Sequence, residues 1–262
     1  MDNAGRRRRR PGKPMYLDVI ELRDFYSTLL GAVVVRQVGP CLAALGGPQP
    51  SDRVLGFGFA TPFLGPLRGR AERVLAFMPA GQGVLQWPAD GPSATALVHE
   101  DQLPLADSSL DWVYLVHALE MSQRPEVLME EVRRVLAPGG RVVAVVPNRQ
   151  GPWARSDRSP FGFGRPYSRG QVKRLFFAAG FEADRWRTAL HVPPARSRSL
   201  IRAAAALDRV GAELWPAFSG VICVRAMKQT GHVAALRRRR ALAPSFSPAL
   251  NPNAGVVGRS AL

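Results

Sequence analysis

The sequence predicts an α/β domain with a doubly wound, mostly parallel seven-stranded sheet and helices on both of its faces. Three observations support this prediction: short apolar runs alternate with helix-like segments, the run at residues 141–146 is almost wholly apolar, and Gly- and Pro-rich turns separate the segments. Parallel strands that are covered on both faces read as continuous apolar runs, and their alternation with helices implies right-handed crossovers. The length of 262 residues suits one such domain with tails.

Periodicity and turn residues place the individual elements. Apolar residues at helical spacing predict a helical region over residues 15–49, broken at Gly39-Pro40 and again at Gly46-Gly47-Pro48. Further helices are expected at residues 125–136, before Pro138-Gly139-Gly140, at 168–179, where Ser168 is the N-cap, and at 199–214. The seven strands are expected at residues 53–56, 71–78, 96–99, 110–116, 141–146, 183–191 and 221–227.

The positive charge is concentrated at the two ends of the chain. Of the net charge of +16, residues 1–14 carry +5 and residues 225–262 carry +7, which leaves +4 for the rest. We expect basic, disordered tails at 1–14 and 229–262 around a domain at 15–228. Such tails could contact RNA, DNA or anionic lipid. Solvated ends are the favoured interpretation, because no aromatic residues alternate with the arginines.

Other residue types exclude several kinds of protein. No apolar run is long enough to cross a bilayer, and no signal peptide is expected, because acidic residues interrupt the stretch that follows the basic N-terminus. Cys41 and Cys223 cannot build a disulfide framework or a zinc cluster, so we expect a cytoplasmic protein. The four histidines are scattered, and we therefore expect no metal site.

A series of short motifs in the second half of the chain resembles a known family. The matching residues are Leu103-Pro104-Leu105, Asp107, Ser109-Leu110-Asp111, Arg134-Val135-Leu136, Pro138-Gly139-Gly140 and Ala178-Ala179-Gly180-Phe181. In this order and spacing they resemble the class I S-adenosylmethionine-dependent methyltransferases of the type 11 kind. The resemblance implies a Rossmann-like fold and S-adenosylmethionine as cofactor. It also implies a methyltransferase whose acceptor, a small molecule or a macromolecule, is unknown.

The resemblance also implies where the cofactor binds. In an open α/β sheet, ligands lie beyond the carboxyl ends of the strands. The candidate cofactor residues are therefore the loop residues Gly56, Gly58, Ala60 and Thr61, the strand-end residue Met78, and the acidic turn Glu100, Asp101 and Gln102. In that turn Glu100 or Asp101 would bind the adenine amino group, and the equally supported alternative is a solvated acidic turn. His117 follows the fourth strand and is the catalytic candidate, because the resemblance implies that this position faces the reacting methyl group. The alternative is a structural histidine, which is the more frequent role of a lone histidine. Asp107, Asp111 and Tyr114 are expected to be structural.

The cofactor loop departs from the family pattern. The family's acid is replaced by Gly56, its second glycine by Ala60 and its third by Pro62. The second strand ends without a carboxylate to hold the ribose, which costs about 1.5–3 kcal/mol of binding unless Gln82, Gln86 or backbone groups substitute. These changes motivate an alternative, a catalytically inactive binding or scaffold protein, associated with RNA if the basic tails bind it. An NAD-binding site is less favoured, because Thr61 stands where a third glycine belongs.

The long loop at residues 148–166 is the candidate substrate loop. It combines aromatic and guanidinium side chains, and the candidates within it and at its end are Trp153, Arg155, Arg165 and Tyr167. Such a mixture suits an anionic or planar substrate. The alternative is a surface loop that packs its own aromatic residues.

Overall fold

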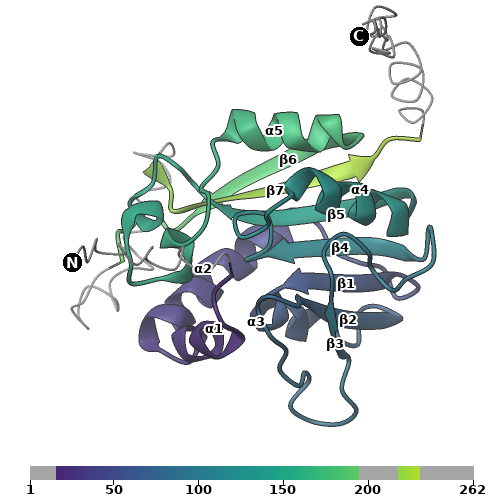
Figure 1. Cartoon of the computed structure of the whole chain (residues 1–262), viewed down its shortest axis with the longest axis horizontal. Helices are drawn as coiled ribbons and strands as arrows, with labels where there is room; N and C mark the ends of the chain where they lie inside the picture. Colours follow the sequence, from purple (N-terminus) through teal and green to yellow (C-terminus); the bar gives the residue numbers. More distant parts are fainter. Residues whose placement is uncertain (1–15, 195–217, 231–262) are drawn as a thin grey trace, which may run out of the picture. The chain divides into compact units, whose positions relative to one another are not determined.

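The computed structural model describes residues 16–194 and 218–230, which contain one seven-stranded sheet (Figure 1). The strand order is β3-β2-β1-β4-β5-β7-β6. The first five strands pair in parallel, and β7 runs antiparallel to both β5 and β6. This is the doubly wound, mostly parallel sheet that the sequence predicts. The strands are β1 (Arg53–Gly58), β2 (Arg73–Pro79), β3 (Thr95–Val98), β4 (Leu110–Val116), β5 (Leu136–Pro147), β6 (Phe181–Ala189) and β7 (Val221–Lys228).

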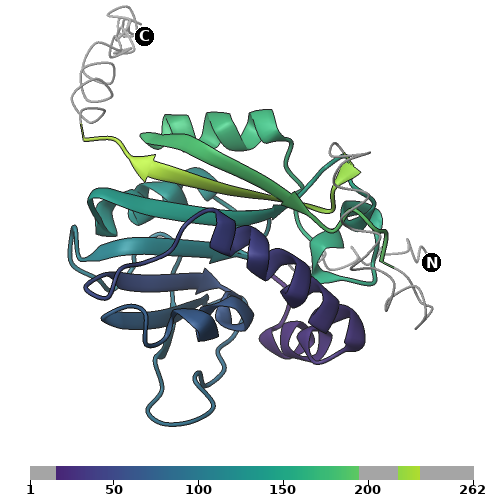
Figure 2. The same ribbon diagram turned by 180° about the vertical axis from the view of Figure 1, so that it is seen from behind.

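Helices cover both faces of the sheet. The amphipathic helices α4 and α5 lie on the face seen in Figure 1, and the long helix α2 crosses the opposite face, seen in Figure 2. The helical segments, including the short 3-10 turns, are α1 (Val19–Tyr26), α2 (Leu29–Ala44), α3 (Thr61–Leu64), η1 (Gly65–Leu67), α4 (Pro125–Val135), η2 (Pro152–Arg155), η3 (Pro160–Gly162) and α5 (Arg169–Ala178).

Side-chain alternation along the central strand β4 divides the core into two layers. Val113 and Leu115 pack in the cluster beneath α4 and α5, whereas Trp112 and Tyr114 pack in the cluster beneath α2. Successive side chains of a strand point to opposite faces, so a central strand that is apolar from Trp112 to Val116 supplies both layers. The carboxyl ends of β1 to β4 therefore lie at one common edge of the sheet.

The expected 15–49 region is interrupted between α1 and α2 rather than at Gly39-Pro40, and two further differences involve proline. Pro40 does not break α2, because it lies within a helix that continues to Ala44. Pro138-Gly139-Gly140 is a bulge inside β5, since Leu136 pairs with Leu110 and Arg141 already pairs with Trp112. The expected Ser168 cap is confirmed, with Gln171 completing a capping box.

Some expectations concern residues outside the described part of the chain. These are the helix at 199–214, the tail at 1–14 and almost all of the tail at 229–262, so the domain boundaries stay predictions. The described residues lie in a compact unit that ends at Thr230. Among the described helices none is long and apolar enough by itself to cross a membrane, and α1 and α2 meet the length and composition test only as a pair bent by 85°.

Candidate functional site

The fold brings the predicted site residues to one edge of the sheet. Gly58 at the end of β1 is in register with Val116, the last residue of β4, and Pro79 at the end of β2 is in register with Val98 of β3. The end of β2 with Met78 and the loops that carry Glu100 and His117 therefore lie on the same edge as the carboxyl end of β1. This is the edge at which open α/β sheets bind ligands.

The loop after β1 is tightly packed. Gly58 has a φ of +86°, and a Cβ on it would lie 2.2 Å from the Val116 carbonyl oxygen, so only glycine fits there. At Gly56 a Cβ would lie 2.5 Å from Leu64, so this side chain fills the space into which the family's carboxylate would project. Ala60 is buried, and Thr61 begins α3, which is only four residues long. Pro62 lies in the first turn of this helix, where a missing N–H is tolerated.

Apolar side chains fill the space above this loop. Phe59, Met78 and Met121 are 3%, 0% and 0% exposed and pack against Val19 and Leu22 of α1. We call these five residues the closing cluster. The ring of Tyr26, at the end of α1, is stacked on Phe59 with a centroid distance of 5.6 Å. The candidate cofactor residue Met78 thus belongs to an apolar contact with the protein's own N-terminal helix.

The segment before α1 contacts the acidic turn after β3. The Tyr16 hydroxyl donates a hydrogen bond to the Glu100 carboxylate. Burial and the neighbouring Glu100 raise the pKa of Tyr16 well above its ordinary value. The Tyr16 ring also lies over the loop after β2, because a Cβ on Gly81 would be 2.8 Å from it. The backbone N–H of Val19 donates to the Gln82 carbonyl oxygen at 2.8 Å.

Asp101 and Gln102, the two residues that follow Glu100, make contacts other than the one with Tyr16. Asp101 forms an exposed ion pair with Arg124 at 2.5 Å. Gln102 is exposed, and its backbone pairs with His99. Of the three cofactor candidates in this turn, Glu100 alone has a hydrogen bond to the segment before α1 among the described residues.

A hydrogen-bonded series of polar side chains lies at the end of β4. The Tyr26 hydroxyl is 2.8 Å from His117 Nε2, and His117 Nδ1 is 3.2 Å from Glu120 Oε1. His117 and Glu120 are 0% and 1% exposed, and His117 has a φ of +50°. Burial and the nearby Glu120 raise the pKa of Tyr26. These two hydrogen bonds join the side chains of Tyr26, His117 and Glu120 into one series, which we call the relay.

Two buried side chains at this edge have polar atoms without a hydrogen-bond partner in the described part of the chain. They are Glu120 Oε2 and both polar atoms of the Gln82 side chain, which is 1% exposed. Such groups cost about 1–3 kcal/mol each when nothing satisfies them. Sequence reasoning offered Gln82 only as a substitute for the ribose acid, and it missed Tyr26 and Glu120. A carboxylate three residues after His117 in an otherwise apolar stretch was the available signal for Glu120.

The candidate substrate loop packs its rings inward and leaves its guanidinium groups in solvent. Trp153 is 2% exposed and donates from Nε1 to the Val192 carbonyl oxygen at 2.8 Å. Tyr167 donates to the Leu119 carbonyl oxygen at 3.1 Å. Arg155 and Arg165 are exposed. The loop reaches the relay through Phe161, whose ring centroid is 4.7 Å from that of His117.

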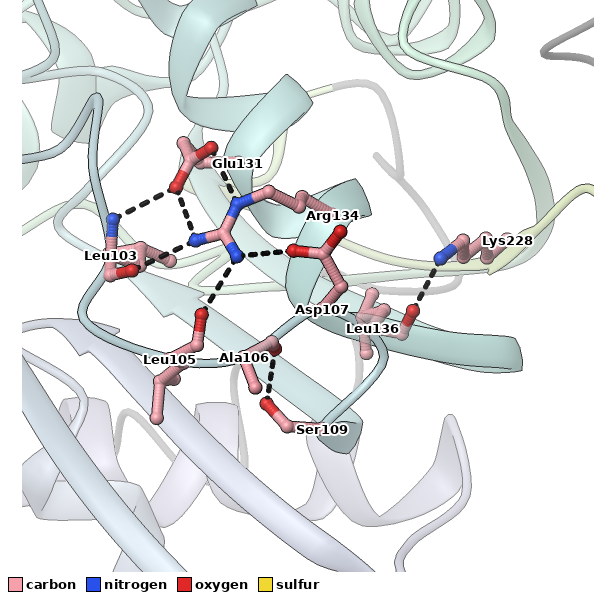
Figure 3. A network of polar contacts seen from close by, with 9 residues as sticks. All are labelled: Leu103, Leu105, Ala106, Asp107, Ser109, Glu131, Arg134, Leu136 and Lys228. Carbon is pink, nitrogen blue, oxygen red and sulfur yellow. Dashed lines mark hydrogen bonds and ion pairs between the residues drawn. The ribbon is translucent and has the colours of Figure 1, made fainter.

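The part of the motif series around Asp107 and Arg134 has a structural role instead. Arg134 of α4 donates hydrogen bonds to Glu131, Asp107 and the carbonyl oxygens of Leu103 and Leu105, as Figure 3 shows. Asp111 accepts a hydrogen bond from the backbone N–H of Arg53 at 2.8 Å. Asp107 therefore ties its loop to α4, and Asp111 ties β4 to β1, so both have the structural role that was expected. No group of three potential metal ligands occurs among the described residues.

Comparison with known proteins confirms the family resemblance and the fold. Residues 82–144 match a family model described as a methyltransferase domain. A methyltransferase structure from Thermotoga maritima, described as S-adenosylmethionine-dependent and as a possible histamine N-methyltransferase, superposes with a TM-score of 0.55 at 17% identity, over 80% of this chain and 96% of that one. An S-adenosylmethionine-dependent methyltransferase from Mesorhizobium loti gives a TM-score of 0.52 at 18% identity, over 77% of this chain and 100% of that one.

A third solved structure with this fold is named for an activity other than methyl transfer. It is the [4+2]-cyclase SpnF, with a TM-score of 0.55 and 20% identity, covering 85% of this chain and 100% of that one. The sequence matches none of the curated proteins. At these identities the structural likeness shows a shared Rossmann-like fold, and it leaves the chemistry to the site.

The residues at this edge do not fit S-adenosylmethionine in the arrangement described. Leu64 fills the position of the first acid, and β2 ends in Met78 and Pro79 with no carboxylate. The closing cluster fills the space between the Gly58 turn and the Glu100 turn, and the Glu100 carboxylate is already bonded to Tyr16. A nucleoside needs both the volume and the acceptors that these side chains occupy.

Proposed function

We propose that this chain, which carries a methyltransferase domain, uses the fold to bind a ligand other than S-adenosylmethionine and does not transfer methyl groups. The observation that supports the proposal is the closing cluster, in which Phe59 and Met78 pack against α1 at the position where adenosine would lie. The two missing carboxylates support it independently, because no movement of α1 would supply them.

The energy needed to open this edge favours the same conclusion. Admitting a nucleoside would expose Phe59, Met78, Met121 and Leu22, and each such side chain contributes about 1.5–3 kcal/mol through burial. The total of about 6–12 kcal/mol is comparable to the 8.2 kcal/mol that corresponds to micromolar binding. A cofactor that bound only by opening the cluster would therefore bind weakly.

The name of one structural neighbour is consistent with a function other than methyl transfer. SpnF is described as a cyclase although it shares this fold. Function in such folds depends on the site rather than on the sheet. The site that remains here is the relay of Tyr26, His117 and Glu120, together with the unsatisfied Gln82.

The second candidate is methyl transfer from S-adenosylmethionine to an unidentified acceptor. The match of residues 82–144 to a methyltransferase domain favours it, as does the position of His117 directly after β4. In this case α1 would have to leave the edge of the sheet, which would free Glu100 for adenine and place the relay beside the donor. A cytoplasmic location and a nucleic-acid partner stay predictions under either candidate.

Isothermal titration of the full chain with S-adenosylmethionine and S-adenosylhomocysteine, each up to about 1 mM, separates the two candidates. We expect no saturable heat, because the energy needed to open the closing cluster would reduce the binding free energy below about 4.1 kcal/mol. That value corresponds to a dissociation constant of about 1 mM. Glu100→Gln serves as the matched variant, with its thermal unfolding midpoint measured to show that it is folded. Saturable binding to the natural chain that is lost in Glu100→Gln would overturn the proposal in favour of methyl transfer.

A further inference from the structure

A cavity of about 540 Å³ lies between the second half of α2 and the short helical turns α3 and η1, on the face of the sheet seen in Figure 2. Its volume is within the usual range of small-molecule sites, about 300–1,000 Å³. Gly39 and Gly47 line it, and a Cβ on either would meet no atom within 4 Å. Most of its walls are apolar, and they include Val35, Leu42, Phe63 and Leu67. The cavity shares no residue with the closing cluster or the relay, so it is a second site.

A hydroxyl without a hydrogen-bond partner among the described residues faces this cavity. Tyr114 of β4 lines the cavity, and its ring is stacked on Trp112 with a centroid distance of 6.0 Å, as its expected structural role requires. The residue is only 3% exposed. Its hydroxyl is nevertheless not one of the fully enclosed polar atoms without a partner, which belong to Gln82, Glu120 and Ser159. The Tyr114 hydroxyl therefore keeps accessible surface, and a ligand in the cavity can bond to it.

An exposed guanidinium group lines the same cavity. Arg70 follows η1 and forms no ion pair among the described residues, and it is the one charged residue that they contribute to the cavity wall. Burial raises the pKa of Tyr114, and the positive charge of Arg70 opposes this shift, so the two groups are near enough to interact. Asp52 also affects the pKa of Tyr114, but it lies outside the cavity wall and accepts hydrogen bonds from Trp112 and Gln49. The charge of the cavity wall therefore favours an anion.

We propose that this cavity binds a small amphipathic carboxylate, a single carboxylate group on an aromatic or aliphatic body. The carboxylate accepts hydrogen bonds from the Arg70 guanidinium and the Tyr114 hydroxyl, and the apolar body lies against Leu42 and Phe63. Arginine is suited to this role, because its planar fork matches the two oxygens of a carboxylate. One guanidinium also balances one negative charge, whereas a phosphate monoester would bring nearly two. The inference goes beyond the proposed function and does not depend on it, because the cavity lies outside the place where adenosine would bind.

The test uses the full chain and three carboxylate probes: 3-phenylpropionate, 4-methylpentanoate and octanoate. We expect at least one to bind with a dissociation constant below about 1 mM, by titration calorimetry or saturation-transfer NMR. The matched neutral and cationic probes, 3-phenylpropanol and 3-phenylpropylamine, should bind at least about tenfold more weakly than 3-phenylpropionate, because a charge-assisted hydrogen bond contributes about that much. Acetate keeps the charge without the apolar body and should also bind at least about tenfold more weakly, since it cannot fill the cavity.

These probes give two outcomes that would overturn the proposal. The first is that none of the three carboxylates binds. The second is that 3-phenylpropionate binds no more tightly than 3-phenylpropanol or acetate. Equal affinity for acetate would mean that the positive charge of the chain attracts anions without a shaped site.

Variants locate the binding. Arg70→Gln should weaken carboxylate binding about tenfold or more, and Tyr114→Phe, which keeps the stacked ring, should weaken it severalfold. Arg36→Gln is the matched control, because Arg36 is an exposed arginine of α2 outside the cavity wall, and it should leave binding unchanged. Unchanged affinity in Arg70→Gln or in Tyr114→Phe, with an unchanged thermal midpoint, would place the carboxylate elsewhere and end the proposal. S-adenosylmethionine binding that depends on Glu100 and not on Arg70 would contradict the proposed function alone.

Discussion

At the scale of single residues, Arg134 shows the structural role of part of the motif series. One guanidinium group holds the loop at Leu103 and Leu105 to α4 through two carbonyl oxygens, and it is itself held by Glu131 and Asp107 (Figure 3). These acceptors raise the pKa of Arg134, and the hydrogen bond from Arg134 lowers the pKa of Glu131. The network fixes the chain between β3 and β4 and needs no ligand.

Glu131→Gln tests the stabilising role of this network. The pKa of Glu131 is lower in the folded chain than its ordinary value of 4.5, so its contribution is present above about pH 4.5 and is lost as the pH falls through the folded value. We expect the variant to lose about 1–3 kcal/mol of unfolding free energy at pH 7. The difference from the natural chain should shrink below pH 4.5. Urea unfolding across this pH range measures it, and a difference that does not change with pH would contradict the assignment.

Gly58→Ala tests whether the loop glycine is required by packing. The substitution places a Cβ 2.2 Å from a carbonyl oxygen at a φ of +86°. We expect a loss of about 2 kcal/mol or more in unfolding free energy. Gly69→Ala is the matched control, because Gly69 has a φ of +80° with open space around it, so only the backbone strain of about 1 kcal/mol remains. Equal losses in the two variants would show that the close approach to Val116 has no cost.

At the scale of elements, α1 determines what the carboxyl edge can do. Its inner face carries Val19 and Leu22 into the closing cluster, and the residues before it reach Glu100 through Tyr16. A helix of eight residues has little stability of its own, so this packing holds it in place. Weakening its inner face should therefore loosen α1 before it affects the sheet.

Leu22→Ala tests this dependence. Leu22 is 0% exposed, and its truncation should cost about 2–5 kcal/mol and speed proteolytic cleavage near α1. Ile20→Ala on the same helix is the matched control, because Ile20 is 41% exposed and its loss should cost much less. Limited proteolysis with mass spectrometry locates the cleavage. Similar cleavage rates in the two variants would show that the closing cluster does not hold α1.

At the scale of the whole molecule, the net charge of +16 sits largely in segments outside the described fold. Residues 1–14 and 231–262 can be removed without touching a described strand or helix, whereas a cut at 225 would remove half of β7. If the tails bind RNA, the deletion should abolish that binding. In the natural chain the affinity should fall steeply between 50 and 200 mM salt, by orders of magnitude if six or more phosphates are contacted. Filter binding measures the RNA affinity of the deletion variant and the salt dependence of the natural chain. Unchanged RNA affinity after the deletion would show that the tails do not bind RNA.

The sequence by itself determined the order and class of the elements, because apolar periodicity and turn residues are local properties. The strand at Leu110–Val116 and the Ser168 cap could be located in this way, and the motif string led to the correct fold. Pro40 was misjudged, since packing of α2 on the sheet outweighs a local breaking signal. Tertiary structure alone decided the site. Periodicity shows which face a side chain occupies but not which distant residue it meets, so only the folded chain could show Phe59 and Met78 packed on α1 and Tyr26 joined to His117.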